Sequence, residues 1–173
     1  MSVDIDLASL SIKDALDLAV LMEEEAEERY RELADNLELH NTSEAAGFFR
    51  FMVTSEAEHG KELAAKRNEL FGDEPAEVDR SMLWDVEAPG YEATRAFMTV
   101  QEALDVAMAA ERKAYEFFDG ALPAVEDPGV RELFTELRQE EVEHMRMVRE
   151  QMKKAPRADG FDPDDFADAP VAQ

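Results

Sequence analysis

The sequence predicts an all-α protein, an antiparallel four-helix bundle with one long crossover between its second and third helices. Three observations carry this prediction. Glycine and proline are scarce within four long stretches and gather between them. Apolar side chains recur through each stretch with the period of about 3.6 residues that is typical of a helix facing a core. The segment at about 72–96 is long, as a connection from one end of a bundle to the other requires.

The first two helices are bounded by caps and turn residues. The first is expected to begin at Ser11, which can cap it together with Asp14, and to end at a turn over 36–41. The second is expected to run from about 41–43 to Phe71. Their apolar stripes are Leu16, Val20, Glu23, Ala26, Tyr30, Leu33 and Leu37 in the first helix, and Phe49, Met52, Glu56, His59, Leu63 and Leu70 in the second.

The third and fourth helices have clearer start signals. Thr99 and Glu102 form a capping box for the third, which ends around 120–123; Asp127 caps the fourth, which ends before Pro156. We expect residues 1–155 to form the bundle and the acidic tail at 156–173 to be mobile or to lie on a partner. The stripes are Leu104, Met108, Glu111, Ala114 and Phe118 in the third helix, and Val130, Phe134, Leu137, Glu141, His144 and Val148 in the fourth.

Composition excludes several classes of function. The 173 residues suffice for one domain with a core, and 42 acidic against 18 basic residues give a formal charge of −24. This charge argues against binding nucleic acid or an anionic membrane, and suits cations or a basic protein partner. The chain has no cysteine, so disulfides, thiolate catalysis and cysteine-based metal sites are excluded within it. With neither a secretory signal nor a membrane-length apolar run in the sequence, we expect a cytoplasmic protein.

The two halves of the chain repeat one design. Residues 11–19 align with 99–107, and the same ungapped register places Glu23 on Glu111 and Tyr30 on Phe118. Further along, the segment 56–59 aligns with 141–144, so that each half contains one Glu-x-x-His motif. The repeat predicts two similar helical hairpins joined by the crossover.

Carboxylates and imidazoles on apolar stripes predict a metal site. A Glu and a His three residues apart project from one face of a helix. Burying a bare carboxylate costs several kcal/mol unless it is paired, protonated or bound to a metal, and the stripes contain no Lys or Arg. A lone histidine on a stripe is more often a core residue, but this repeated set favours two divalent ions. The predicted ligands are Glu23, Glu56, His59, Glu111, Glu141 and His144.

These motifs, in this order over about residues 11–154, resemble the rubrerythrin branch of the ferritin-like di-iron proteins. The resemblance implies a ferritin-like bundle whose six ligands hold two iron ions, with zinc or manganese as substitutes. It implies that Tyr30 is a catalytic residue that hydrogen-bonds a ligand carboxylate, which Phe118 in the other half cannot do. Ala114 stands where some rubrerythrins carry an additional carboxylate. Without cysteine, the chain resembles the stand-alone domain that lacks rubredoxin, which implies a separate electron-donor protein.

The leading functional hypothesis is an oxidoreductase that reduces hydrogen peroxide or dioxygen at a di-iron centre. One alternative is a ferroxidase or iron-handling protein, in which ferrous ions are the substrate and the acidic surface attracts them. The other is a non-catalytic, metal-binding helical interaction module. Family resemblance also implies a homodimer or larger homo-oligomer, with Trp84, Tyr91 and Phe97 as contact residues.

Overall fold

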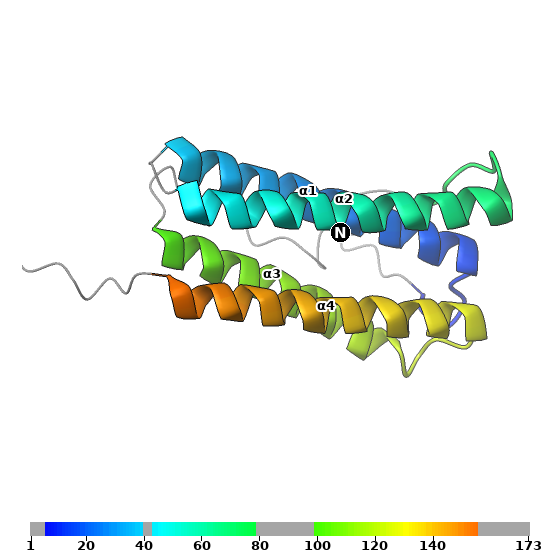
Figure 1. Cartoon of the computed structure of the whole chain (residues 1–173). Coiled ribbons are helices and arrows are strands. Elements are labelled where there is room, and N and C mark those ends of the chain that lie inside the picture. The colour runs from blue at the N-terminus through cyan, green and yellow to red at the C-terminus, as the bar shows by residue number, and fades with distance from the viewer. Residues whose placement is uncertain (1–5, 40–42, 79–98, 156–173) are drawn as a thin grey trace, which may run out of the picture.

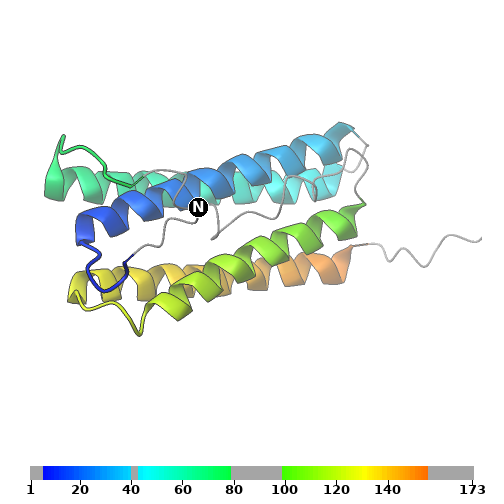
Figure 2. The same ribbon diagram turned by 180° about the vertical axis from the view of Figure 1, so that it is seen from behind.

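The computed structural model describes residues 6–39, 43–78 and 99–155. Within these ranges the chain forms four helices and no strand: α1 (Ile12–Leu39), α2 (Ser43–Phe71), α3 (Val100–Ala121) and α4 (Pro128–Lys154). The antiparallel hairpin α1–α2 lies over the antiparallel hairpin α3–α4 (Figures 1 and 2). Because α3 begins at the opposite end of the bundle from the end of α2, the two hairpins are connected as the predicted crossover requires. The predicted four-helix bundle is therefore confirmed.

Several sequence-based expectations fall outside the described residues. These are the crossover beyond residue 78, with its proposed contact residues Trp84, Tyr91 and Phe97, and the tail at 156–173. None of the four described helices has an apolar stretch long enough to cross a membrane.

The helices begin at the predicted caps. The Thr99 side chain accepts a hydrogen bond from Glu102 N–H at 3.2 Å, and the Glu102 carboxylate accepts one from Thr99 N–H at 2.8 Å. The Asp127 carboxylate accepts from two backbone N–H groups of the first turn of α4, at 2.8 and 3.0 Å. At the start of α1, Asp14 N–H donates to Ser11 Oγ at 3.1 Å. Each cap satisfies N–H groups that have no partner inside the helix.

The end of α1 was predicted wrongly. The helix continues through the expected turn at 36–39 and ends at Leu39. Leu37 is buried, so the apolar face extends into this last turn. Arg50 of α2 also donates to the Glu38 carboxylate at 3.0 Å, which links the end of α1 to the neighbouring helix.

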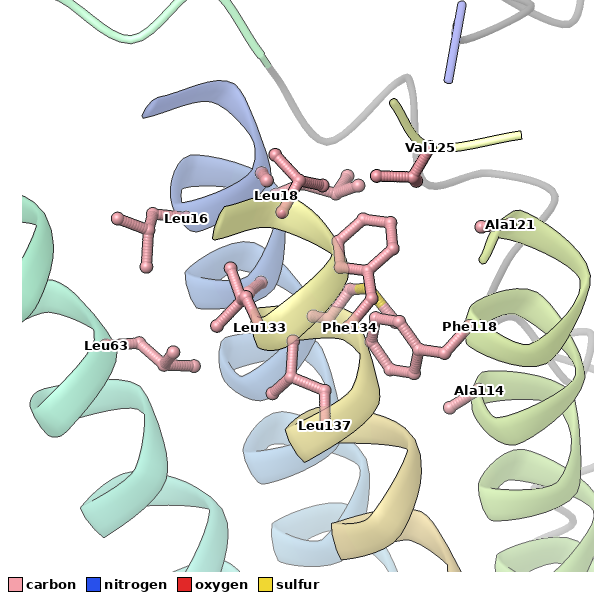
Figure 3. Close-up of a cluster of buried hydrophobic side chains, with 14 residues drawn as sticks. Leu16, Leu18, Leu63, Ala114, Phe118, Ala121, Val125, Leu133, Phe134 and Leu137 are labelled. Carbon is pink, nitrogen blue, oxygen red and sulfur yellow. The ribbon is translucent and has the colours of Figure 1, made fainter. Parts of the chain in front are cut away.

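The apolar core consists of two clusters along the length of the bundle. Figure 3 shows the first, which includes Leu16, Leu18, Leu63, Ala114, Phe118, Ala121, Val125, Leu133, Phe134 and Leu137. The second includes Tyr30, Leu33, Ala34, Leu37, Ala46, Phe49, Met52, Ala103, Leu104, Ala107, Met108 and Val148. On every helix, the glutamate of the predicted stripe falls between residues of the two clusters. The fold therefore places a polar layer part-way along its core.

Leu70 is an exception to the predicted stripe of α2, because its side chain is 55% exposed. Leu63 is the last buried hydrophobic residue on this helix. The final turn of α2 projects beyond the start of α1 (Figures 1 and 2), and the adjacent Phe71 packs against the core instead of Leu70.

An ion pair that the sequence did not predict secures the end of α2. Arg67 Nε donates to Asp17 of α1 at 2.7 Å, and the same guanidinium donates to the backbone carbonyls of Gly72 and Glu74 at 2.6 and 2.5 Å. The first residues of the crossover are thereby held against the α1–α2 hairpin.

Candidate metal centre

All six predicted ligands meet in the polar layer between the two apolar clusters. Three groups of three residues have donor atoms that all lie within 4.8 Å of one another, and the groups share members, so that they form one continuous cluster. The groups are Glu56, His59 and His144; Glu111, Glu141 and His144; and Glu23, His59 and Glu140. Glu23, Glu56, Glu111 and His144 are buried, whereas His59 and Glu141 are partly exposed.

Helix geometry explains how the residues converge. Each Glu-x-x-His motif presents its two side chains on one face, and the repeat brings the motifs of α2 and α4 face to face. The His59 and His144 rings stack nearly parallel, with centroids 5.5 Å apart and an interplanar angle of 10°. Gly60 allows a close approach of α1, since a Cβ added there would stand 3.4 Å from the Cβ of Glu23.

His144 lies among carboxylates. Its Nδ1 is 3.3 Å from Glu111 Oε2, 3.4 Å from Glu56 Oε1 and 3.9 Å from Glu141 Oε2. Burial alone would lower the pKa of His144, but the hydrogen bond and charge of Glu111, with the charges of Glu23 and other carboxylates, outweigh it and raise that pKa above 6.5. The surrounding carboxylates therefore favour the protonated form of His144 in the metal-free protein.

Glu23 shows the cost of burying a carboxylate. Desolvation raises the pKa of Glu23 above 4.5, and the hydrogen bond with Glu56 and the charges of the two histidines only partly oppose this effect. A proton on either carboxylate would relieve this cost in the metal-free state, because only a protonated carboxyl group can donate such a hydrogen bond. A divalent cation could replace this proton.

His59 provides a direct test of whether the residues fit a metal. Its Nδ1 is buried and has no hydrogen-bond partner among the described residues. Buried polar atoms are normally satisfied, and a ring nitrogen of His59 lies within 4.8 Å of carboxylate oxygens, so this imidazole is well placed to bind a cation. Carboxylate oxygens with a few imidazole nitrogens suit iron or manganese. The donor set therefore fits metal binding.

A small cavity of about 20 Å³ adjoins the cluster and is bordered by residues of all four helices. This volume is enough for one molecule of about the size of water. Tyr30 and Phe118, which the repeat aligns, both line it, together with the carboxylates of Glu23, Glu56, Glu111 and Glu141. The Tyr30 hydroxyl is buried and has no hydrogen-bond partner among the described residues, so the predicted bond to a ligand carboxylate is not formed here. The asymmetry predicted from such a bond therefore stays a prediction, although Tyr30 and Phe118 do give the two halves different polarity at this cavity.

Glu140 is a residue of the cluster that the sequence-based prediction missed. It is half-buried, and desolvation raises its pKa although the charges of His59 and His144 oppose the shift. It borders a second cavity, of about 160 Å³, between α2 and α4, which is also lined by His59, Glu62 and Glu136. Its position just before Glu141 and off the apolar stripe made it resemble a solvated residue. The sequence feature that could have revealed it is the pair Glu140–Glu141 before His144, because the first repeat has only one glutamate, Glu56, at the equivalent place.

Comparisons with known proteins agree with this architecture. The family model described as Rubrerythrin matches residues 14–152. A crystal structure of an uncharacterised conserved protein from Magnetospirillum magnetotacticum MS-1 is similar, with a TM-score of 0.73 and 29% sequence identity over 86% of this chain and 97% of that chain. No curated protein matches the chain. The similarity to that structure extends over nearly its whole length.

Proposed function

Because the chain belongs to the rubrerythrin family, we propose that the cluster binds two iron ions and that this centre reduces hydrogen peroxide or dioxygen. The observation that carries the proposal is the convergence of four glutamates and two histidines between two apolar clusters. His59 would hold one ion and His144 the other, with the carboxylates of the four helices around them. Zinc or manganese would be substitutes for iron in the same donor set.

With two ferrous ions bound, the centre could supply the two electrons which, with two protons, convert hydrogen peroxide into two water molecules. The protein's own residues would provide the surroundings. The small cavity has room for a molecule of about the size of water, and apolar side chains such as Met22 and Phe118 line it together with the carboxylates. The buried Tyr30 hydroxyl is available to donate a hydrogen bond to an oxidant held there. Since the chain has no cysteine, electrons would come from a separate donor protein.

The first experiment titrates the metal-free protein with ferrous iron and then admits peroxide or air. We expect the near-ultraviolet absorption of ferric iron to saturate at two irons per chain. With a generic reductant, the protein should consume peroxide, and Glu56→Ala should abolish both the metal content and this activity. Glu58→Ala is the matched control, because Glu58 lies on the same helix but is exposed. A titration without saturable iron binding would reject the proposed function.

A second candidate function, oxidation of ferrous ions as the substrate, is favoured by the acidic cavity between α2 and α4. Glu62 and Glu140 line this cavity and would attract cations toward His59, with Lys66 offsetting only part of their charge. Excess ferrous iron with dioxygen and no other reductant distinguishes the two functions. Many oxidised irons per chain would support the ferroxidase, whereas a single turnover of two irons would support the peroxidase.

We also propose that the chain forms a homodimer or a larger homo-oligomer. Among the described residues, Phe51 on α2 is 56% exposed and Val142 on α4 is 40% exposed. Large apolar side chains at the surface are common at subunit contacts. Light scattering should give at least twice the mass of the 19.5 kDa chain.

A further inference from the structure

We infer that Glu140 is a seventh donor of the metal centre and binds the ion that His59 holds. The inference deepens the proposed function, since it rests on metal binding by the cluster. Its starting point is the group formed by Glu23, His59 and Glu140, whose donor atoms all lie within 4.8 Å of one another. The three residues come from α1, α2 and α4, so the bundle itself brings them together.

The orientation of Glu140 follows from its place on α4. Adjacent residues on a helix point about 100° apart. Glu141 faces Glu111 and His144, as their donor atoms show, and Glu140 is turned toward α2, where it meets His59. The two neighbouring glutamates therefore serve different ends of one cluster.

The spacing of the donor atoms suits a shared ion. Donors about 2 Å from one metal ion lie at most about 4 Å apart. An ion would have to draw the three side chains inward only slightly. His59 Nδ1 is buried and has no hydrogen-bond partner among the described residues, and Glu23 is only 8% exposed. The cavity of about 160 Å³ beside Glu140 leaves room for the side chain to move and for water to complete the coordination.

Only the second half of the repeat contains this donor. Aligning the Glu-x-x-His motifs places Ser55 of α2 opposite Glu140 of α4, so the first hairpin supplies no equivalent carboxylate. On α3, Ala114 contributes only a methyl group near the centre. Four carboxylates balance the charge of two divalent ions, and a fifth adds a negative charge at the His59 end. The ion at His59 would therefore be bound differently from the ion at His144.

The test is a titration of the metal-free protein with Co²⁺, whose visible absorption reports its coordination. Bound ions are counted by equilibrium dialysis. We expect the wild-type chain to bind two ions. Glu140→Gln should leave one ion bound as in the wild type, weaken the other about tenfold or more, and change the visible spectrum. Glu140→Asp keeps the charge but withdraws the oxygen by one methylene, and should also weaken that ion.

Two control variants separate ligation from general electrostatic attraction. Glu136→Gln removes the same charge from the same cavity, about one helical turn away, and Glu132→Gln removes it from an exposed position on α4. Both should keep the spectrum and the affinities of the wild type within about twofold, because neither residue is in the cluster of donors.

Each outcome decides a different question. Wild-type spectra and affinities in Glu140→Gln, or equal weakening in Glu136→Gln, would overturn the role of Glu140 while leaving the two-metal centre intact. A wild-type chain that binds no cobalt and no iron would overturn the proposed function as well. Circular dichroism of the metal-free variants verifies folding, and Glu140→Gln should fold at least as well as the wild type because it removes a half-buried charge.

Discussion

Tyr30 and Phe118 occupy equivalent positions in the two halves of the chain and line the same cavity. Tyr30 stacks on Phe49 with ring centroids 5.9 Å apart, so packing fixes its ring. Its hydroxyl, buried without a hydrogen-bond partner among the described residues, adds nothing to the stability of the metal-free protein. A group that costs free energy in the resting structure and borders the candidate site is best explained by a role with a bound molecule.

Tyr30→Phe should separate stability from activity. We expect the metal-free variant to be as stable as the wild type or up to about 1 kcal/mol more stable, because a buried unsatisfied hydroxyl is removed. Metal affinity should be unchanged, while peroxide turnover should fall by about tenfold or more if the hydroxyl contacts the oxidant. Urea unfolding, metal titration and a peroxide assay measure the three quantities. Tyr115→Phe is the control, since Tyr115 does not line this cavity; equal turnover in both variants would argue against the role of Tyr30.

Each helix places its candidate metal-binding glutamate between two apolar stretches. In α3, for example, Glu111 stands between Met108 of one cluster and Ala114 of the other. The apolar parts fix the helices, and the helices then fix the carboxylates. This order of causes explains why a polar layer can persist in a metal-free core, whose stability comes from the clusters at its two ends.

A glycine within α2 and a glycine directly after it should respond in opposite directions to substitution by alanine. Gly47 lies inside the helix, and a Cβ added there meets nothing within 4 Å, so Gly47→Ala should stabilise the protein by about 0.5–1 kcal/mol. Gly72 follows the helix with φ +54°, a left-handed conformation that costs residues with a Cβ about 1–2 kcal/mol. Gly72→Ala should therefore destabilise. Urea unfolding of both variants measures the shifts, and shifts of the same sign would contradict the described end of α2.

Periodicity, caps and the internal repeat predicted the four helices and brought out the six candidate ligands, because each of these features is local in sequence. Errors arose where a neighbouring helix decides the outcome. Asn36 indicated a turn, yet contacts with α2 extend α1 to Leu39. Leu70 continued the apolar period, yet its side chain is exposed, and the adjacent Phe71 packs against the core instead. Glu140 was missed because its proximity to His59 depends on how α4 lies against α2, which a pattern within one helix cannot reveal.

For the molecule as a whole, the metal centre brings together buried carboxylates in a chain that already has a large excess of negative charge. The chain has a formal charge of −24, and part of that negative charge is buried. Desolvation raises the pKa of Glu23 and of Glu140 above 4.5. Desolvation alone would lower the pKa of His144, but the Glu111 carboxylate and its neighbours outweigh this effect and raise the pKa above 6.5. In the metal-free protein these shifts favour the protonated forms, which would offset part of the negative charge that metal ions would otherwise balance.

The metal-free and metal-bound proteins should therefore differ in how their stability depends on pH. A group whose pKa is higher in the folded than in the unfolded chain stabilises the fold fully below its unfolded pKa, and that contribution is lost as the pH rises through its folded pKa. For the metal-free protein, Glu23 and Glu140 should cause a loss of stability as the pH rises above 4.5, and His144 a further loss above 6.5. All three effects have the same sign, and the large negative charge of the chain adds to them.

Metal binding requires deprotonated ligands, so the stabilisation that it contributes grows as the pH rises. Thermal unfolding with a chelator and with excess Mn²⁺, at about pH 5.5, 7 and 8.5, measures both dependences. We expect the melting temperature to fall across this series with the chelator and the difference between the two conditions to widen. Glu56→Ala should remove the widening, because it removes a buried ligand, whereas the exposed control Glu58→Ala should retain it. A metal-free protein that becomes more stable from pH 5.5 to 8.5 would show that these buried groups do not hold protons as the structure indicates.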